Sequence, residues 1–176
     1  MDVLYKNQTA LPPFEEATDA CWRDLTQNAN LLFKQGNYKQ ARTFYQCALK
    51  EAEDIFTSAQ MGADYTDTDP ASLLIASSTN LVQNLTKLED HSQAYQVLSG
   101  IVHRLCRTLL DDVSSYRLKR KCAQHLQYVT RYLVKVMQSG GSPQETIAKE
   151  VQFAKDCFIK FSSPTTTYYQ SARSVA

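Results

Sequence analysis

The sequence has few of the residues that interrupt helices, with only five glycines and five prolines among its 176 residues. Such a low content leaves long uninterrupted stretches and disfavours a turn-rich β fold. No stretch of useful length alternates apolar and polar residues, so no amphipathic strand is expected. The composition, 43% apolar and 10% aromatic, is nevertheless typical of a chain with a packed core. We therefore predict an all-α fold.

Several classes of protein need features that the sequence lacks. A formal net charge of +1 provides no global field for binding nucleic acid or an anionic membrane. No apolar run approaches the length that spans a bilayer, and the N-terminus does not resemble a secretory signal. The five cysteines are odd in number and widely scattered, which favours free thiols over a disulfide framework. These features predict a cytoplasmic protein.

Motifs of common enzyme families are missing as well. The chain has no P-loop, no dinucleotide-binding glycine pattern, no G-x-S-x-G turn, no HExxH and no EF-hand loop. Adjacent carboxylates occur at Glu89-Asp90 and Asp111-Asp112, where turn and surface roles are simpler explanations than acid–base catalysis. We therefore expect neither enzymatic activity nor a cofactor.

One arrangement has the spacing of metal ligands. His103 and Cys106 lie three residues apart, as do Cys122 and His125, on two consecutive predicted helices. Two cysteines and two histidines would suit tetrahedral zinc. His103, however, falls opposite the apolar stripe of its helix, which makes convergence of the four side chains difficult. We predict no metal site and retain a small zinc-binding protein as the weaker alternative.

Helix start and stop signals divide the chain into six helices. Pro12-Pro13, followed by acidic residues, predicts the start of the first helix, and Gly36-Asn37 predicts its end. The second helix begins near 38, the third runs from 69–70 to about 88, and the fourth follows a turn at 89–91. The fifth helix runs from 114 or 115 to 139–141. The sixth begins with a capping box at 142–145 and reaches about 161. We expect an N-terminal extension at 1–11, a helical domain at 12–162 and a flexible tail at 163–176.

Residues 22–55 contain a repeat pattern. The segment Gly36-x-Tyr38-x-x-Ala41-x-x-x-Tyr45-x-x-Ala48-Leu49, preceded by Leu25, Ala29 and Leu32, resembles a tetratricopeptide repeat. Ala29 and Ala41 are small enough to let two helices approach closely. Glu53 stands where the family often has a helix-ending proline, so the second helix is expected to continue. A degenerate copy covers about 75–108, with Ala94 in the role of Ala41.

The third hairpin, at about 115–161, shows helical periodicity without the repeat pattern. The resemblance therefore implies three tetratricopeptide-like hairpins in a short right-handed array. In such arrays the first helix of each pair lines a concave groove that binds a peptide or helix. The positions that the resemblance assigns to this groove are Arg23, Thr26, Asn30, Phe33, Lys34, Ala76, Thr79, Asn80, Gln83 and Lys87.

The fifth predicted helix adds a polar stripe. Its members, at helical intervals, are Arg117, Arg120, Gln124, Gln127, Arg131 and Lys135, and we include Arg120, Gln124 and Arg131 in the binding groove. The cations would suit an acidic segment or a terminal carboxylate, although such a stripe is more often the solvated face of a helix. Asn30 and Asn80 match the asparagines of the family's carboxylate clamp, or are simply surface residues. Thr26 replaces the first lysine of that clamp.

These observations predict a non-catalytic module that binds a protein or peptide segment, as an adaptor, chaperone or complex subunit. The partner would be acidic or would present its C-terminus, and neither nucleic acid nor a membrane is expected. The alternative is a structural module that forms a homodimer through the exposed face of its last hairpin.

Overall fold

The computed structural model describes residues 19–63 and 68–163, and this part of the chain is all-helical. Its elements are α1 (Ala20–Lys34), α2 (Tyr38–Gln60), α3 (Pro70–Lys87), α4 (His91–Leu110), α5 (Tyr116–Ser139) and α6 (Gln144–Ser162). No strand occurs within these ranges. The predicted all-α class and six helices are confirmed. The predicted helix start at Pro12-Pro13, the extension at 1–11 and the tail beyond Ser163 lie outside the described residues.

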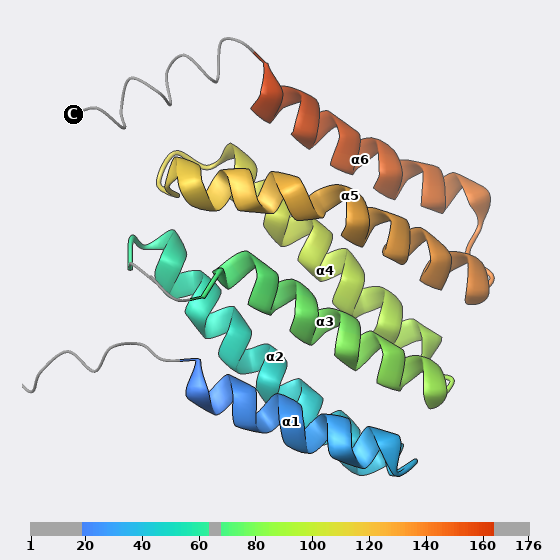
Figure 1. The fold of residues 1–176 in the computed structure, drawn as a ribbon. Coiled ribbons are helices and arrows are strands. Elements are labelled where there is room, and N and C mark those ends of the chain that lie inside the picture. Colours follow the sequence, from blue (N-terminus) through green and yellow to red (C-terminus); the bar gives the residue numbers. More distant parts are fainter. Residues whose placement is uncertain (1–18, 64–67, 164–176) are drawn as a thin grey trace, which may run out of the picture.

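Consecutive helices run antiparallel and stack in chain order (Figure 1). The helices α1, α3 and α5 form the near layer of this view, and α2 and α4 lie behind them. Neighbours in sequence pack together, and α3 also packs against α5 and α4 against α6. The helices α5 and α6 therefore each contact the two helices immediately before them in the chain. In the described ranges, no helix has the length and apolar content to cross a membrane.

One apolar cluster runs through the whole stack, from Ala29 in α1 to Cys157 in α6. Ala29 and Ala41 are both fully buried, which lets the backbones of α1 and α2 approach closely at their crossing. The third helix is the most enclosed, since its small polar residues Ser77, Ser78 and Thr79 are buried along with its leucines. The reason is that α3 packs against α2, α4 and α5 at once.

Four of the helices, α1, α2, α3 and α5, end in the same kind of turn. After α1, the amide of Asn37 donates to the carbonyl of Leu32 at 2.9 Å, as in a Schellman motif. The residues in the left-handed conformation are Gly36, Gly62 and Gly141, with φ of 78°, 95° and 72°, and the non-glycine Glu89, with φ of 58°. The predicted stop at Gly36-Asn37 is thus confirmed.

Side-chain caps begin three helices. The carboxylate of Asp69 accepts a hydrogen bond from the amide of Ala71 at 3.2 Å, that of Asp90 caps α4, and the hydroxyl of Ser115 caps α5. The predicted capping box at the start of α6 is wrong. No side chain caps α6, whose N-cap residue is Pro143. The amide of Ser142 instead donates to Met137 O at 2.9 Å, so this serine belongs to the turn that ends α5.

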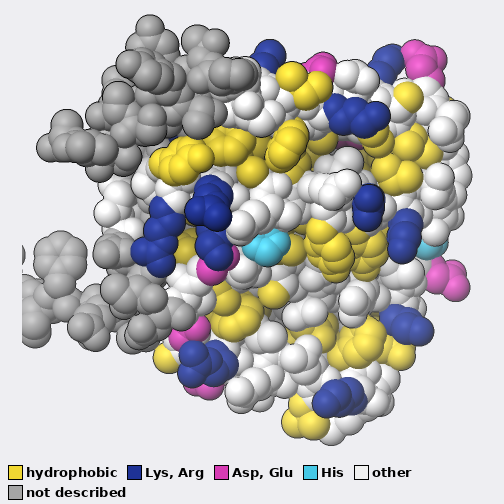
Figure 2. Space-filling model, turned by 45° about the horizontal axis from the view of Figure 1, so that its top comes forward, with side chains coloured by type: hydrophobic (Ala, Val, Ile, Leu, Met, Phe, Trp, Pro, Cys, Tyr) yellow, Lys and Arg dark blue, Asp and Glu magenta, His cyan; other side chains and the backbone are white. Residues whose placement is uncertain are grey.

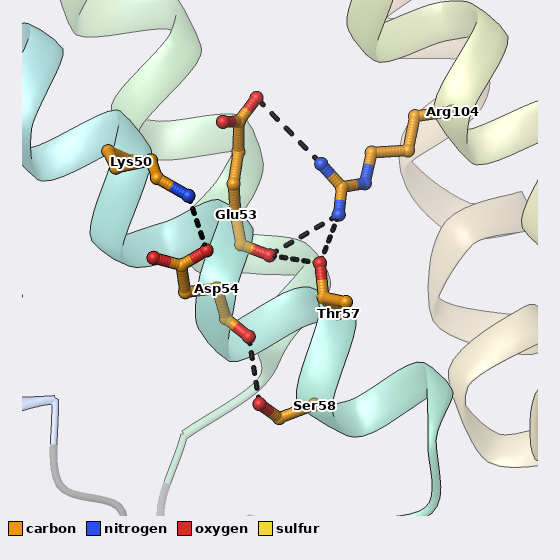
Figure 3. A network of polar contacts seen from close by, with 6 residues as sticks. All are labelled: Lys50, Glu53, Asp54, Thr57, Ser58 and Arg104. Carbon is orange, nitrogen blue, oxygen red and sulfur yellow. Dashed lines mark hydrogen bonds and ion pairs between the residues drawn. The ribbon is translucent and has the colours of Figure 1, made fainter.

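Polar side chains join helices that are not neighbours in sequence. Figure 3 shows Arg104 of α4 reaching α2, where its Nη2 donates to Thr57 Oγ1 at 2.5 Å and to Glu53 O at 3.3 Å. Its guanidinium also lies over the ring of Phe56, 5.2 Å from the centroid. In the near layer, Trp22 of α1 donates to Ser77 of α3 at 2.6 Å. These contacts fix successive helix pairs relative to each other.

The strained turn after α3 generates a stability prediction. Glu89→Gly is expected to raise the free energy of unfolding by about 0.5–1 kcal/mol, because the left-handed conformation disfavours a side chain. Gly36→Ala is the matched opposite. Nothing lies within 4 Å of a Cβ added at Gly36, so backbone strain alone should lower the free energy of unfolding, by about 1–2 kcal/mol. Urea unfolding followed by circular dichroism measures both, and a destabilised Glu89→Gly variant would contradict the prediction.

Candidate binding surface

A hollow of about 430 Å³ opens between the C-terminal ends of α1, α3 and α5, and we call it the three-helix hollow. Its lining consists of Phe33, Gln83, Thr86, Lys87, His91, Tyr132, Lys135, Val136 and Ser139. Phe33 is held by edge-to-face contacts with Tyr38 and Tyr45, at centroid distances of 5.2 and 6.3 Å. A half-buried, rigidly packed ring of this kind offers a preorganised apolar contact.

A larger groove of about 740 Å³ lies between α5 and α6. The fifth helix lines this α5/α6 groove with Ala123, Gln124, Leu126, Gln127, Thr130, Arg131, Val134, Lys135 and Gln138, and the sixth with Val151, Ala154, Lys155, Phe158 and Ile159. Phe158 and Ile159 are 45% and 62% exposed. Lys135 lines both depressions, so they adjoin at α5.

The two depressions have one sign of charge. Their ionised side chains are Lys87, Arg131, Lys135 and Lys155, and none of the described residues that line them is an aspartate or glutamate. In Figure 2, which brings the side of α5 and α6 forward, Lys and Arg side chains are scattered among apolar patches. The acidic side chains of this view lie mostly toward its edges. The surface thus combines apolar contact area with positive potential.

Five of the predicted groove residues line these depressions. Phe33, Gln83 and Lys87 lie in the three-helix hollow, and Gln124 and Arg131 lie in the α5/α6 groove. The structure therefore divides the predicted site between two adjoining depressions. The larger one, the α5/α6 groove, contains predicted residues from α5 alone.

The remaining predicted residues line neither depression. They are Arg23, Thr26, Asn30, Lys34, Ala76, Thr79, Asn80 and Arg120. Arg23 pairs with Asp19 at 2.7 Å, and Asn30 Oδ1 accepts a hydrogen bond from Tyr45 at 2.8 Å. The assignment of Thr79 to the groove is wrong. Its side chain is buried and donates to Ile75 O at 2.9 Å, because α3 is enclosed on three sides.

Sequence reasoning missed much of the α5/α6 groove. Lys155, Phe158 and Ile159 of α6 were not predicted, nor was Tyr132 of α5 in the three-helix hollow. A signal for the groove exists in α6, whose core stripe consists of Ile147, Ala154 and Cys157. The neighbouring Phe158 and Ile159 extend the apolar surface beyond this stripe, which indicates a second apolar face.

The residues of the zinc alternative do not converge. His103 Nε2 lies 3.3 Å from Glu150 Oε2, and the His103 ring stacks on Phe153 with 4.4 Å between centroids. The second histidine, His125, lies beside α3, 3.1 Å from Ser72 Oγ. Among the described residues, no three His, Cys, Asp or Glu side chains form a group that could hold a metal ion.

All five cysteines are free thiols, as predicted, with Cys21 and Cys47 exposed and the others buried. Burial raises the pKa of the Cys122 thiol to about 12. The pKa of the Cys106 thiol is also raised, first by burial and then by its contact with Cys157. The Cys106 and Cys122 thiols therefore remain protonated at neutral pH and act as apolar core residues.

Asp69 joins the start of α3 to α5. Besides the amide of Ala71, its carboxylate accepts a hydrogen bond from Ser72 at 2.7 Å and lies 3.5 Å from Lys121 Nζ and 3.8 Å from His125 Nε2. Burial pushes the pKa of Asp69 upward, but the nearby His125, the hydrogen bond from Ser72 and the charge of Lys121 outweigh burial. The pKa of this carboxyl is consequently held well below its usual range.

A model of the family described as "Protein of unknown function (DUF2753)" matches residues 20–164. The chain belongs to the DUF2753 family. The match begins at the first residue of α1 and ends just after α6, so the DUF2753 region and the helical stack coincide, with both depressions inside it. No curated protein matches the sequence significantly, and no solved structure does so either.

The contacts of Asp69 predict how the stability of this DUF2753 chain depends on pH. Asp69→Asn keeps a good N-cap side chain but removes the charge, and should lower the free energy of unfolding by about 1–2 kcal/mol at neutral pH. Because the folded-state pKa is depressed, the contribution of Asp69 is complete above its ordinary pKa near 4 and is lost as the pH falls below it.

The difference between wild type and Asp69→Asn should therefore stay constant from pH 7 to about pH 4 and shrink when urea unfolding is repeated below pH 4. Asp54→Asn is the control, since Asp54 pairs with Lys50 at the exposed surface and its loss should cause no measurable change. A difference that also stays constant below about pH 4 would contradict an ionic role for Asp69.

Proposed function

We propose that the chain is a non-catalytic protein-binding module of tetratricopeptide-like type. Support for this type comes from burial, since Ala29, Ala41, Tyr45 and Ala48 of the repeat pattern are all at most 3% exposed. Further support comes from the layering, in which α1, α3 and α5 share one side of the stack. The equivalent Ala94 of the degenerate copy is also fully buried.

The observation that carries the binding function is the character of the three-helix hollow. Side chains from α1, α3 and α5, together with His91 at the start of α4, meet there around an apolar floor that includes Phe33 and Val136. Lys87 and Lys135 supply positive charge without a carboxylate in the lining. A segment with apolar and acidic side chains is complementary to this lining, because its carboxylates would pair with the lysines.

A carboxylate clamp is not required for this function. Asn30 already accepts a hydrogen bond from Tyr45, and Thr26 stands in place of the clamp's first lysine. We therefore propose that acidic side chains are recognised within the segment, and that a free C-terminus contributes less than they do.

A display library of random peptides, presented with both free and internal ends, tests this proposal. Wild-type protein should enrich peptides that combine Asp or Glu with apolar residues. The double variant Lys87→Glu, Lys135→Glu should retain them about tenfold less, because two attractions become repulsions. Lys39→Glu is the matched control, since Lys39 is exposed and lines neither depression. Equal retention by the double variant, or enrichment without acidic residues, would contradict the proposal.

A second candidate function is self-association through the last helix, favoured by the exposure of Phe158 and Ile159. A two-fold interface brings the same patch of both copies together. Sedimentation at increasing concentration would then show a dimer that Ile159→Asp dissociates.

A further inference from the structure

We propose that the α5/α6 groove is the docking site for an amphipathic, acidic α-helix of a partner protein. This inference goes beyond the function proposed above, because it concerns a different depression and a defined secondary structure in the partner. It rests on three observations: the packing order of the stack, the chemistry of the groove lining, and the sign of its charge.

The packing order defines a vacant helix position. The fifth helix lies against both α3 and α4, and it buries Cys122, Leu126, Val129 and Leu133 in doing so. The groove between α5 and α6 is the equivalent position one helix pair further along the stack: a helix there would pack against α5 and α6 as α5 packs against α3 and α4. No described helix fills it, and its wall residues Phe158 and Ile159 remain exposed.

The lining has the properties of a helix-packing surface. Ala123 of α5 and Ala154 of α6 are small side chains that would allow another helix to approach closely. Val134, Val151 and Phe158 supply apolar contacts around them. Along α5 the lining extends from Ala123 to Gln138, or about 22 Å at 1.5 Å per residue. This length matches about four turns of a partner helix, whose apolar residues would recur at intervals of three and four.

The charge of the groove selects the partner. Arg131 and Lys135 lie on the α5 side and Lys155 on the α6 side, without acidic residues in the described lining. A helix with an apolar stripe flanked by Asp or Glu on both sides would pair with these cations. A second copy fits less well, because a two-fold contact would set the cations of one groove against those of the other. The chain's own last residues, 164–176, contain Arg173 and no Asp or Glu.

The test is a selection from displayed helices of about 16 residues, each with a fixed apolar stripe and random flanking positions. Full-length wild-type protein is the bait, and variant Ile159→Asp is used to remove non-specific binders. We expect enrichment of acidic residues at the flanking positions. The best helix is then synthesised with a fluorescent label, and its affinity is measured by anisotropy. The same peptide with its acidic flanking residues replaced by lysine should bind at least about tenfold more weakly.

Variants assign the binding to the groove. Ile159→Asp and the double variant Arg131→Glu, Lys155→Glu should each weaken binding by about tenfold or more. Ile159 is largely exposed, so the fold should persist, as circular dichroism can verify. Lys87→Glu and Lys39→Glu should leave the affinity within about twofold, because neither residue lines this groove. Lys87→Glu is the variant that separates the two proposals, because Lys87 lines only the three-helix hollow whereas Lys135 lines both depressions.

Several results would overturn the inference. They are the absence of any enriched helix, enrichment without acidic flanks, and binding that Ile159→Asp leaves unchanged. Concentration-dependent dimerisation that Ile159→Asp abolishes would assign the groove to a second copy instead. Binding of a synthetic peptide of residues 1–18 with the same response to the variants would assign it to the chain's own N-terminal segment, which contains Asp2, Glu15 and Glu16.

Discussion

The structure depends on one packing constraint: each helix must bury an apolar face, and in a stack it does so against the helices that precede it. The continuous core from Ala29 to Cys157 results from this constraint. Close approach at the first crossing requires the small side chains of Ala29 and Ala41. Within the described residues a stack built in this way is open at its end, because the last pair of helices has preceding neighbours but no following one. The α5/α6 groove is the consequence.

Hydrogen bonds between side chains and their neighbours connect the even-numbered helices. Between α2 and α4, Arg104 bonds to Thr57 and to the backbone of Glu53. Between α4 and α6, Glu150 accepts hydrogen bonds from Tyr95 and Ser99 at 3.1 and 3.3 Å. These partly buried bonds set the spacing of the even-numbered helices and satisfy charges that would otherwise be costly to bury. Arg131 and Lys135, the basic side chains of α5 at the groove, take part in no comparable network with the other described residues. Positive charge is therefore available to a partner where the apolar surface is open.

Much of the fold was predictable because its signals are local. Gly36, Asp69-Pro70 and Ser115 mark helix boundaries through backbone conformation and side-chain caps, which involve only a few neighbouring residues. Where two local signals overlapped, the prediction failed. Ser142 had the spacing of a capping box, but the Schellman turn after α5 uses its amide and makes Pro143 the N-cap residue. The repeat pattern likewise identified small residues at helix crossings, and Ala29, Ala41 and Ala94 are indeed buried.

The sequence by itself determined the all-α class, the six helices and the inward face of most of them, since a period of 3.6 residues encodes which side of a helix is apolar. Only the tertiary structure decided which surfaces stay open. Thr79 became buried because α3 is enclosed by three helices, whereas Phe158 and Ile159 stayed exposed because none of the described helices covers them. Lys155 joined Arg131 in one groove through the packing of α5 against α6. Such relations depend on contacts between distant segments, which no pattern within a single helix contains.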